Sequence, residues 1–328
     1  MHPTTPLMGP LIRTAALAVA MLAGRLPAAA EPFRLIVIPD VQWASQKWPE
    51  LPKQMTAWIV ANRDKENIRY VLQVGDLVQE GGSEPEWQNI DAAMRTLDGQ
   101  VPYILAVGNH DYDRLQPPKS TVMFNRFFPV ERMRKMPGFG GNFPDGRNDN
   151  SFHTFEAGGK KWLVLCLNFM PSKPEIAWGN AVVDKHPEHQ IILLTHSYLT
   201  HTERDVAGQM LWEQLVRRHP NMSMVFCGHL STVHARAEGD QGNSVCEMLF
   251  DWQNDVDPDL NSYFAMVTID PAAGTITTRS YSPALDKELE GGRSGKFEFK
   301  NLRFLPGVAV PAPPAAPAPV PLPTPPQP

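Results

Sequence analysis

Residues 70–76 read YVLQVGD, an apolar run that ends in a glycine and an aspartate. Short runs rich in β-branched and aromatic residues are typical of buried strands. Four other apolar runs, at residues 35–38, 103–107, 191–194 and 222–226, are likewise followed by potential metal ligands. Because sites in open α/β sheets form at the carboxyl ends of strands, we expect the five ends to meet at one crevice. The residues that follow the runs are Asp40, Gln42, Asp76, Asn109, His110, His196 and His229.

Helical patterns separate these predicted strands. Residues 51–62 and 84–97 place apolar side chains at helical spacing, which indicates βαβ units. The right-handed crossover of such units would bring residues 40, 76 and 109 to one sheet edge. Further strands are expected at residues 151–155 and 162–167, and further helices near 173–185 and 205–217. The predicted fold class is α/β, a four-layer α/β/β/α sandwich of two mixed sheets flanked by helices.

Residues 113–150 interrupt the alternation of strands and helices. This stretch contains a proline pair, several phenylalanines and arginines, and the glycine-rich run 138–141. We interpret it as an irregular excursion that covers the site as a functional lid, since long loops in compact domains are usually functional or disordered.

The two ends of the 328-residue chain differ from its middle in composition. Arg13, the apolar run 15–23 and the small residues Ala28 and Ala30 are typical of a signal peptide that is cleaved before Glu31. A retained anchor is the alternative, but the run is shorter than the about 20 residues of a membrane span. We therefore predict a signal peptide at 1–30, one catalytic domain at 31–305 and a secreted or periplasmic protein without a stable membrane span.

The C-terminal segment 306–328 contains 11 of the chain's 33 prolines and no charged residue. Alternating Pro, Ala and Val favour an extended, disordered tail. Either it docks to the cell envelope or it has no specific partner.

Charge and cysteine content exclude some classes of protein. The formal charge is −5, and it becomes −7 once Arg13 and Arg25 are removed, so we expect no nucleic-acid partner and disfavour a nuclease. The three cysteines fit no zinc motif. We expect buried free thiols, with a bridge between Cys227 and Cys246 as the alternative.

The ordered motifs resemble those of the calcineurin-like metallophosphoesterase superfamily, over roughly residues 33–285. The family pattern is D-x-H, G-D, G-N-H-D/E, H and G-H-x-H. This chain has Gln42 in place of the first histidine and Ser231 in place of the last. It is similar to a bacterial, exported D-x-Q branch, whose second D-x-Q pair is matched by residues 251–253.

The resemblance implies two divalent metal ions bridged by Asp76. The first ion would be held by Asp40, Gln42 and Asp76, and the second by Asp76, Asn109, His196 and His229. Gln42 and Ser231 make the first site poorer in nitrogen, which favours Mn, Fe, Mg or Ca over Zn and predicts one tight and one exchangeable ion. His234 is a possible substitute ligand, although strand alternation from Ser231 points it to the opposite face.

The implied reaction is hydrolysis of a small phosphoester by in-line attack of a metal-activated hydroxide. His110 would contact the phosphate and protonate the leaving oxygen. Trp43, Tyr112, Tyr198 and Trp252 could stack on the substrate or simply pack, and His201 and Arg204 could touch the phosphate or cap a helix. The alternative function is a catalytically weak metal-binding module at the cell envelope.

Overall fold

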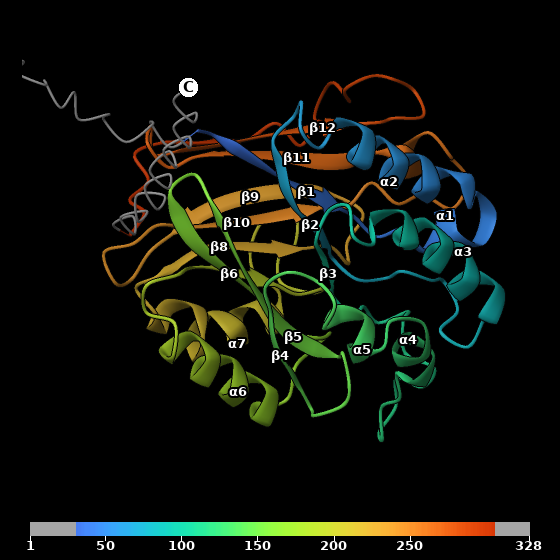
Figure 1. The fold of residues 1–328 in the computed structure, drawn as a ribbon, viewed down its shortest axis with the longest axis horizontal. Helices are drawn as coiled ribbons and strands as arrows, with labels where there is room; N and C mark the ends of the chain where they lie inside the picture. Colours follow the sequence, from blue (N-terminus) through green and yellow to red (C-terminus); the bar gives the residue numbers. More distant parts are fainter. Residues whose placement is uncertain (1–30, 306–328) are drawn as a thin grey trace, which may run out of the picture.

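A computed structural model describes residues 31–305 as two mixed sheets with helices on their outer faces (Figure 1). The six-stranded sheet has the order β13 (Glu298–Phe299), β12 (Thr275–Tyr281), β11 (Phe264–Asp270), β1 (Phe33–Ile38), β2 (Ile68–Gln73) and β3 (Tyr103–Leu105). The seven-stranded sheet has the order β4 (Phe139–Phe143), β5 (Asn150–Ala157), β6 (Lys160–Cys166), β7 (Gln190–Leu194), β8 (Met222–Cys227), β10 (Val245–Phe250) and β9 (Val233–Glu238). Strands β1–β2–β3 and β6–β7–β8–β10 run parallel.

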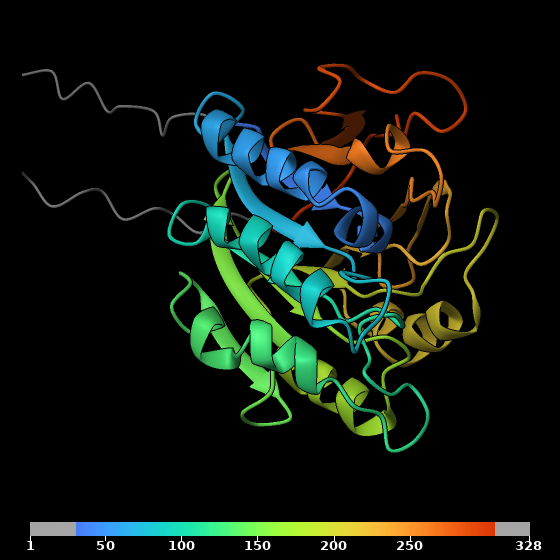
Figure 2. The same ribbon diagram turned by 90° about the vertical axis from the view of Figure 1, so that its right-hand side faces the viewer.

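Helices cover both sheets. The first sheet is covered by α1 (Gln42–Lys47), α2 (Glu50–Asn62) and α3 (Glu84–Met94), which Figure 2 shows in a row. The second sheet is covered by α6 (Lys173–Asp184) and α7 (Val206–Gln214), and the turns η1 (Arg95–Leu97), η2 (Val216–Arg218) and η3 (Leu260–Ser262) are short 3-10 segments. The predicted α/β/β/α sandwich is confirmed.

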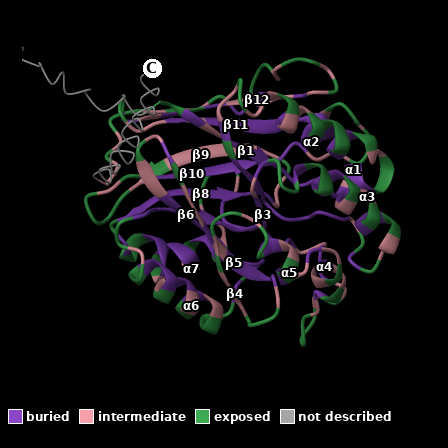
Figure 3. Ribbon diagram, viewed as in Figure 1, coloured by how far each residue is buried: buried purple, intermediate pink, exposed green. Residues whose placement is uncertain are grey.

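Alternation along the central strands creates the layers. In β1, Ile36 and Ile38 pack among the residues of α2 and α3, whereas Leu35 and Val37 point into the interface between the sheets. Because neither face of the strand meets water, its sequence is apolar nearly throughout. Figure 3 shows the same distribution, with buried strands and helices exposed on their outer faces.

The excursion at 113–150 is more regular than its sequence predicts. It contains α4 (Val122–Phe127), α5 (Val130–Met133) and β4, which is the edge strand of the second sheet. Phe124 and Phe128 are fully buried against Trp87 of α3, with ring centroids 6.2 and 6.4 Å away. The prediction of an irregular segment was therefore wrong, because tertiary burial stabilises helices too short to show a periodic pattern.

The three cysteines are buried free thiols, as predicted, and the alternative Cys227–Cys246 bridge is not formed. Within residues 31–305, no helix is long and apolar enough to cross a membrane. The predicted signal peptide at 1–30 and the proline-rich tail at 306–328 lie outside the described residues.

Candidate metal centre

The ends of strands from both sheets converge on one site. Asp40, Asp76 and Asn109 follow β1, β2 and β3 of the first sheet, whereas His196 and His229 follow β7 and β8 of the second. Asp76, His196 and His229 each offer a ligand atom, and these atoms lie within 4.8 Å of one another. The backbone N–H of Gly228 donates to the carbonyl of His196 at 3.0 Å, which joins the two histidine segments.

Glycines allow this close approach. A Cβ on Gly108 would lie 2.1 Å from Asp76 Oδ1, and a Cβ on Gly228 would lie 1.9 Å from Asp40 Oδ1. Gly75 has a φ of +104°, which L side chains rarely adopt, and Asp76 itself has a φ of +52°. Gly108 and Gly228 are therefore required by the space beside the carboxylates, and Gly75 by its backbone conformation and its contact with Gly108.

His196 is oriented as a metal ligand. Its Nδ1 donates to the carbonyl of Val74 at 2.9 Å, so the neutral ring presents a lone pair at Nε2. That Nε2 lies 3.0 Å from Asn109 Oδ1 and 3.2 Å from Asp76 Oδ2, both of which are also acceptors. In the neutral ring all three atoms present lone pairs to one another, an arrangement that a shared cation would stabilise.

In the absence of a metal ion, the negative charge of this cluster also favours a proton on His196. Burial lowers the pKa of His196, but the charge and hydrogen bond of Asp76 outweigh burial and raise this pKa overall. Burial would raise the pKa of Asp76, yet His196 and His110 hold it below its ordinary value. The pair thus forms a strongly polarised site that attracts positive charge.

Asp40 and Gln42 form the other half of the centre. Asp40 Oδ2 accepts hydrogen bonds from the His229 backbone N–H at 3.0 Å and from Gln253 Nε2 at 3.1 Å. Gln42 Nε2 donates to Gln253 Oε1 and, at 3.4 Å, to Asp76 Oδ2. Asp40 Oδ1 and Gln42 Oε1 are buried and have no hydrogen-bond partner among the described residues. Two unpartnered oxygens of this kind suit a hard cation.

Buried carboxylates surround both halves. Burial, together with the charges of Asp251 and Asp76, raises the pKa of Asp40 well above its ordinary range. Burial is also the main cause that raises the pKa of Asp111 and that of Asp251 to about 7. Bound cations would reverse these effects by stabilising the anions. The donor set therefore fits divalent metal ions.

Gln253 connects the carboxylates of the first half, a role that the sequence did not reveal. Its Nε2 donates both to Asp40 Oδ2 and, at 2.8 Å, to Asp251 Oδ2. Residues 251–253 come directly after the buried strand β10, as the other ligand segments follow theirs. Their position after a buried strand was the feature of the sequence that could have revealed this role. Ser231 Oγ donates to the Gln253 carbonyl at 2.7 Å and thereby supports the same segment.

His110 lies beside the cluster with a different orientation. Its backbone N–H donates to Asp76 Oδ1 at 2.9 Å, and its Nδ1 donates to the Gln79 carbonyl at 2.8 Å. Nε2 is thus the atom available to exchange a proton. The neighbouring Asp111 accepts from the backbone N–H groups of Leu77 and Gly108, at 2.7 and 2.8 Å, and so shapes the turn.

Several other candidates are committed to packing. Arg204 forms an ion pair with Glu247 at 2.5 Å and lies 3.8 Å above the Trp212 ring. Tyr198 donates to the same Glu247 at 3.0 Å. Trp252 is buried between the sheets. These residues therefore stabilise the second sheet and its helices.

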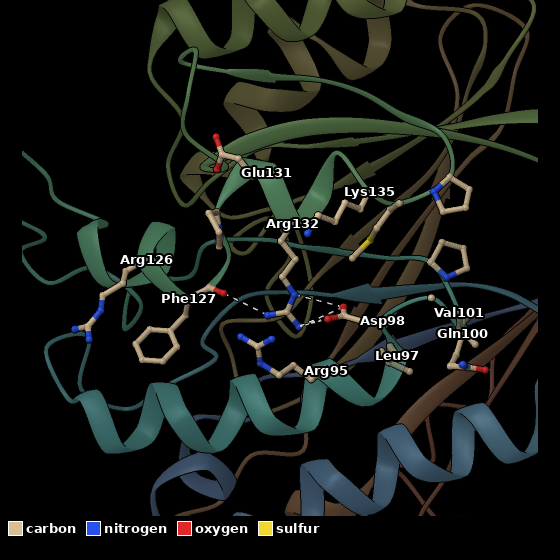
Figure 4. A pocket seen from close by; sticks show the side chains of 15 residues that line it. Arg95, Leu97, Asp98, Gln100, Val101, Arg126, Phe127, Glu131, Arg132 and Lys135 are labelled. Atoms are coloured by element: carbon tan, nitrogen blue, oxygen red, sulfur yellow. Dashed lines mark hydrogen bonds and ion pairs between the residues drawn. The ribbon is translucent and has the colours of Figure 1, made fainter.

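Figure 4 shows the residues that line a cavity of about 570 Å³. This cavity lies at the start of β3, whereas Asn109 follows the end of that strand. It is bordered by the turn before β3 and by α5, and it includes none of the predicted ligands. Its most buried cation, Arg132, pairs with Asp91 at 2.5 Å and with Asp98 at 3.2 Å. Since these charges are already compensated, we assign this cavity no role.

The chain is similar to known proteins in sequence and in fold. The chain is 27% identical over 267 residues to YvnB of Bacillus subtilis (strain 168), in a match that covers 79% of this chain and 20% of YvnB. The chain thus spans about a fifth of that relative's length.

Among solved structures, purple acid phosphatase PPD1 from yellow lupin (Lupinus luteus) seeds matches with a TM-score of 0.54 at 13% identity, over 84% of this chain and 55% of that one. Calcineurin-like phosphoesterase YfkN from Bacillus subtilis has a TM-score of 0.43 at 11% identity, over 77% and 91% of the two chains. A family model described as calcineurin-like phosphoesterase matches residues 33–231, and the chain belongs to that family.

Proposed function

We propose that the protein is a metal-dependent phosphoester hydrolase with a dinuclear centre. The observation that carries this proposal is the convergence of His196 Nε2, Asn109 Oδ1 and Asp76 Oδ2, three atoms that can each donate a lone pair to a metal ion. The unpartnered, buried oxygens of Asp40 and of Gln42, whose amide also contacts Asp76, support a second ion.

The proposed ligands form two sets that share Asp76. Asp40, Gln42 and Asp76 would hold the first ion, and Asp76, Asn109, His196 and His229 would hold the second. Asp76 is suited to bridge because its Oδ2 lies 3.4 Å from Gln42 Nε2 and 3.2 Å from His196 Nε2. Divalent cations bound here would provide a hydroxide nucleophile near neutral pH and neutralise the phosphate's charge.

His110 is the proposed general acid. Because its Nδ1 is held by the Gln79 carbonyl, the ring is fixed with Nε2 free to deliver a proton to the leaving oxygen. Its backbone bond to Asp76 Oδ1 ties the position of the acid to that of the bridging carboxylate.

The two ions are expected to differ in affinity. The first set contains an amide oxygen at Gln42 and no imidazole, whereas the second contains His196 and His229. Oxygen ligands favour Mn, Fe, Mg or Ca over Zn at the first position. We therefore propose one tightly held ion and one exchangeable ion.

We also propose that the protein is an exported member of the D-x-Q branch and acts in the periplasm or outside the cell on small phosphoesters. The support comes from the sequence of residues 1–30, from the D-x-Q pairs at 40–42 and 251–253, and from the acidic net charge. A role of segment 306–328 at the cell envelope belongs to the same proposal.

The test is to restore Mn, Fe, Zn, Mg or Ca to metal-depleted protein and to measure hydrolysis of 4-nitrophenyl phosphate and bis(4-nitrophenyl) phosphate. Asp76→Asn should abolish metal-dependent turnover, whereas Asp240→Asn, which removes only a charge paired with Arg217 at the surface, should not. Metal binding without turnover of either ester would instead favour the metal-binding module.

A further inference from the structure

A second cavity, of about 330 Å³, is lined in part by residues close in sequence to the proposed catalytic residues. Its polar lining comes from the turn after β3, from the excursion at 113–150 and from the segment after β6, and we call it the lid pocket. These lining residues are Tyr112, Lys119, Arg147, Asp149, Asn168 and Glu175.

Residues that line the lid pocket are connected to the segments that carry the proposed catalytic residues. Tyr112 comes two residues after His110 in the same turn. The Asn168 carbonyl accepts a hydrogen bond from Thr195 Oγ1 at 3.4 Å, directly before His196. Lys119 of the lining donates to the carbonyl of Phe169, whose ring centroid is 5.3 Å from that of His229. A phosphate at the centre could thus extend its alcohol group into the pocket.

Two buried polar atoms of this lining have no hydrogen-bond partner among the described residues, namely Tyr112 Oη and Asn168 Oδ1. Each side chain belongs to a residue that is only 7% exposed. Burial is the main cause that raises the pKa of the Tyr112 hydroxyl, and the negative charges of Asp149 and Glu175 raise it further. The hydroxyl therefore lies close to these two lining residues. Buried polar groups are nearly always hydrogen-bonded, so unpartnered ones in a cavity indicate a ligand that completes them.

The charges of the lid pocket cancel. Arg147 pairs with Asp149 at 2.7 Å, and Glu175 accepts from Asn168 Nδ2 at 2.7 Å and from the Ser172 backbone at 2.5 Å. Lys119 donates to the carbonyls of Phe169 and Met170 at 3.3 and 3.4 Å. The buried lining atoms left without a partner are the Tyr112 hydroxyl and the Asn168 amide oxygen, and the Lys119 ammonium keeps one N–H. A neutral ligand that both donates and accepts hydrogen bonds fits this set.

We propose that the lid pocket binds the hydroxyl-rich alcohol portion of the phosphoester substrate, of the size of glycerol or a monosaccharide. A volume near the lower end of the about 300–1,000 Å³ typical of ligand sites suits a group of that size. Alcohol hydroxyls would accept from Lys119 and Tyr112 and donate to Asn168. The inference rests on the proposed hydrolysis and names its substrate class.

Tyr112→Phe tests the inference, because it removes only a hydroxyl that has no partner in the protein. The matched control is Tyr281→Phe, whose hydroxyl bonds to Asp286 on the edge of the first sheet. In the metal-loaded protein, the ratio of kcat/KM for sn-glycerol 3-phosphate to kcat/KM for 4-nitrophenyl phosphate should fall about three- to tenfold in Tyr112→Phe, the value of one lost hydrogen bond. The ratio should stay at the wild-type value in Tyr281→Phe.

A binding measurement separates this inference from the proposed activity. Saturation-transfer NMR with sn-glycerol 3-phosphate on metal-depleted full-length protein needs no turnover. Transfer to the carbon-bound protons is expected in wild type and Tyr281→Phe, and a severalfold smaller signal in Tyr112→Phe. Equal signals in the two variants, no signal in wild type, or an unchanged kinetic ratio would overturn the alcohol site. Failure to hydrolyse either ester would count against the hydrolase alone.

Discussion

Backbone carbonyls determine what the histidines of the centre can do. The Val74 carbonyl accepts a hydrogen bond from Nδ1 of His196, so Nε2 of the neutral ring directs its lone pair toward Asp76. The Gln79 carbonyl accepts from Nδ1 of His110 and holds that ring in a different direction. The sequence predicts which residue types come together, since each follows an apolar run. It does not predict ring orientation, which depends on the path of the turns after β2.

His110→Ala should separate catalysis from metal binding. Turnover of 4-nitrophenyl phosphate is expected to fall about 10²- to 10⁴-fold, the usual contribution of general acid catalysis, while metal content stays constant. His186→Ala is the control, since its Nδ1 also donates to a carbonyl, that of Val182 at 2.7 Å, but outside the centre. Elemental analysis beside the assay checks both, and equal metal loss in His110→Ala would make His110 a ligand or structural residue.

Gln253→Leu should selectively lower the affinity for the first of the two proposed ions. The change removes the amide that orients Asp40 and Asp251, and such supporting contacts typically contribute about 10- to 100-fold in metal affinity. After dialysis against a mild chelator, the variant should retain fewer ions per chain than wild type. Gln209→Leu, which removes an exposed contact to Glu213 in α7, should retain the wild-type number. Equal retention in both variants would refute a positioning role for Gln253.

Most helices and strands of the fold can be predicted from the sequence, because each is long enough for its buried and exposed residues to repeat with the period of a helix or a strand. Strands β1, β2, β7 and β8 and helices α2 and α6 match the predicted ranges to within two residues. The segment 113–150 is the exception, since α4 and α5 span only six and four residues. Helices of that length have no clear period, and the burial of Phe124 and Phe128 against α3 can be seen only in three dimensions.

The turn after β3 requires a residue without a side chain at position 108. In Gly108→Ala, the new Cβ would meet the Asp76 backbone N at 2.2 Å as well as its carboxylate, so the turn must shift. We expect a loss of about 1–3 kcal/mol in the free energy of unfolding, as for other overpacked sites. Chemical denaturation in the presence of chelator measures this loss without a contribution from metal.

Gly82→Ala is the matched control for that experiment. This glycine also lies in a turn near the site, but a Cβ there would meet nothing within 4 Å. Its free energy of unfolding should remain within about 0.5 kcal/mol of wild type, as for ordinary surface substitutions. A similar loss in the two variants would show that the space beside Asp76 is unimportant.

At the scale of the whole molecule, the centre connects the two sheets. Asp40, Asp76 and Asn109 come from the first sheet and His196 and His229 from the second, so the proposed site of the second ion spans the sheet interface. The motif order predicted this set of residues. The contribution of residues 251–253 could not be derived in the same way, because their contact with Asp40 depends on how β10 aligns against the other sheet.

Metal removal should therefore destabilise the whole domain. Without cations, Asp40, Asp76, Asp111 and Asp251 are buried together with only hydrogen bonds to compensate them. A ligand present at 100 times its Kd stabilises the native state by about 2.7 kcal/mol, and about 2–4 °C of Tm accompanies each kcal/mol in chains of this order of size. Differential scanning calorimetry should show Tm lower by roughly 5 °C or more after chelation of wild type. Asp76→Asn lacks the bridge and one buried charge, so chelation should shift its Tm much less. If chelator shifts both proteins equally, or shifts neither, the metals do not connect the sheets through Asp76.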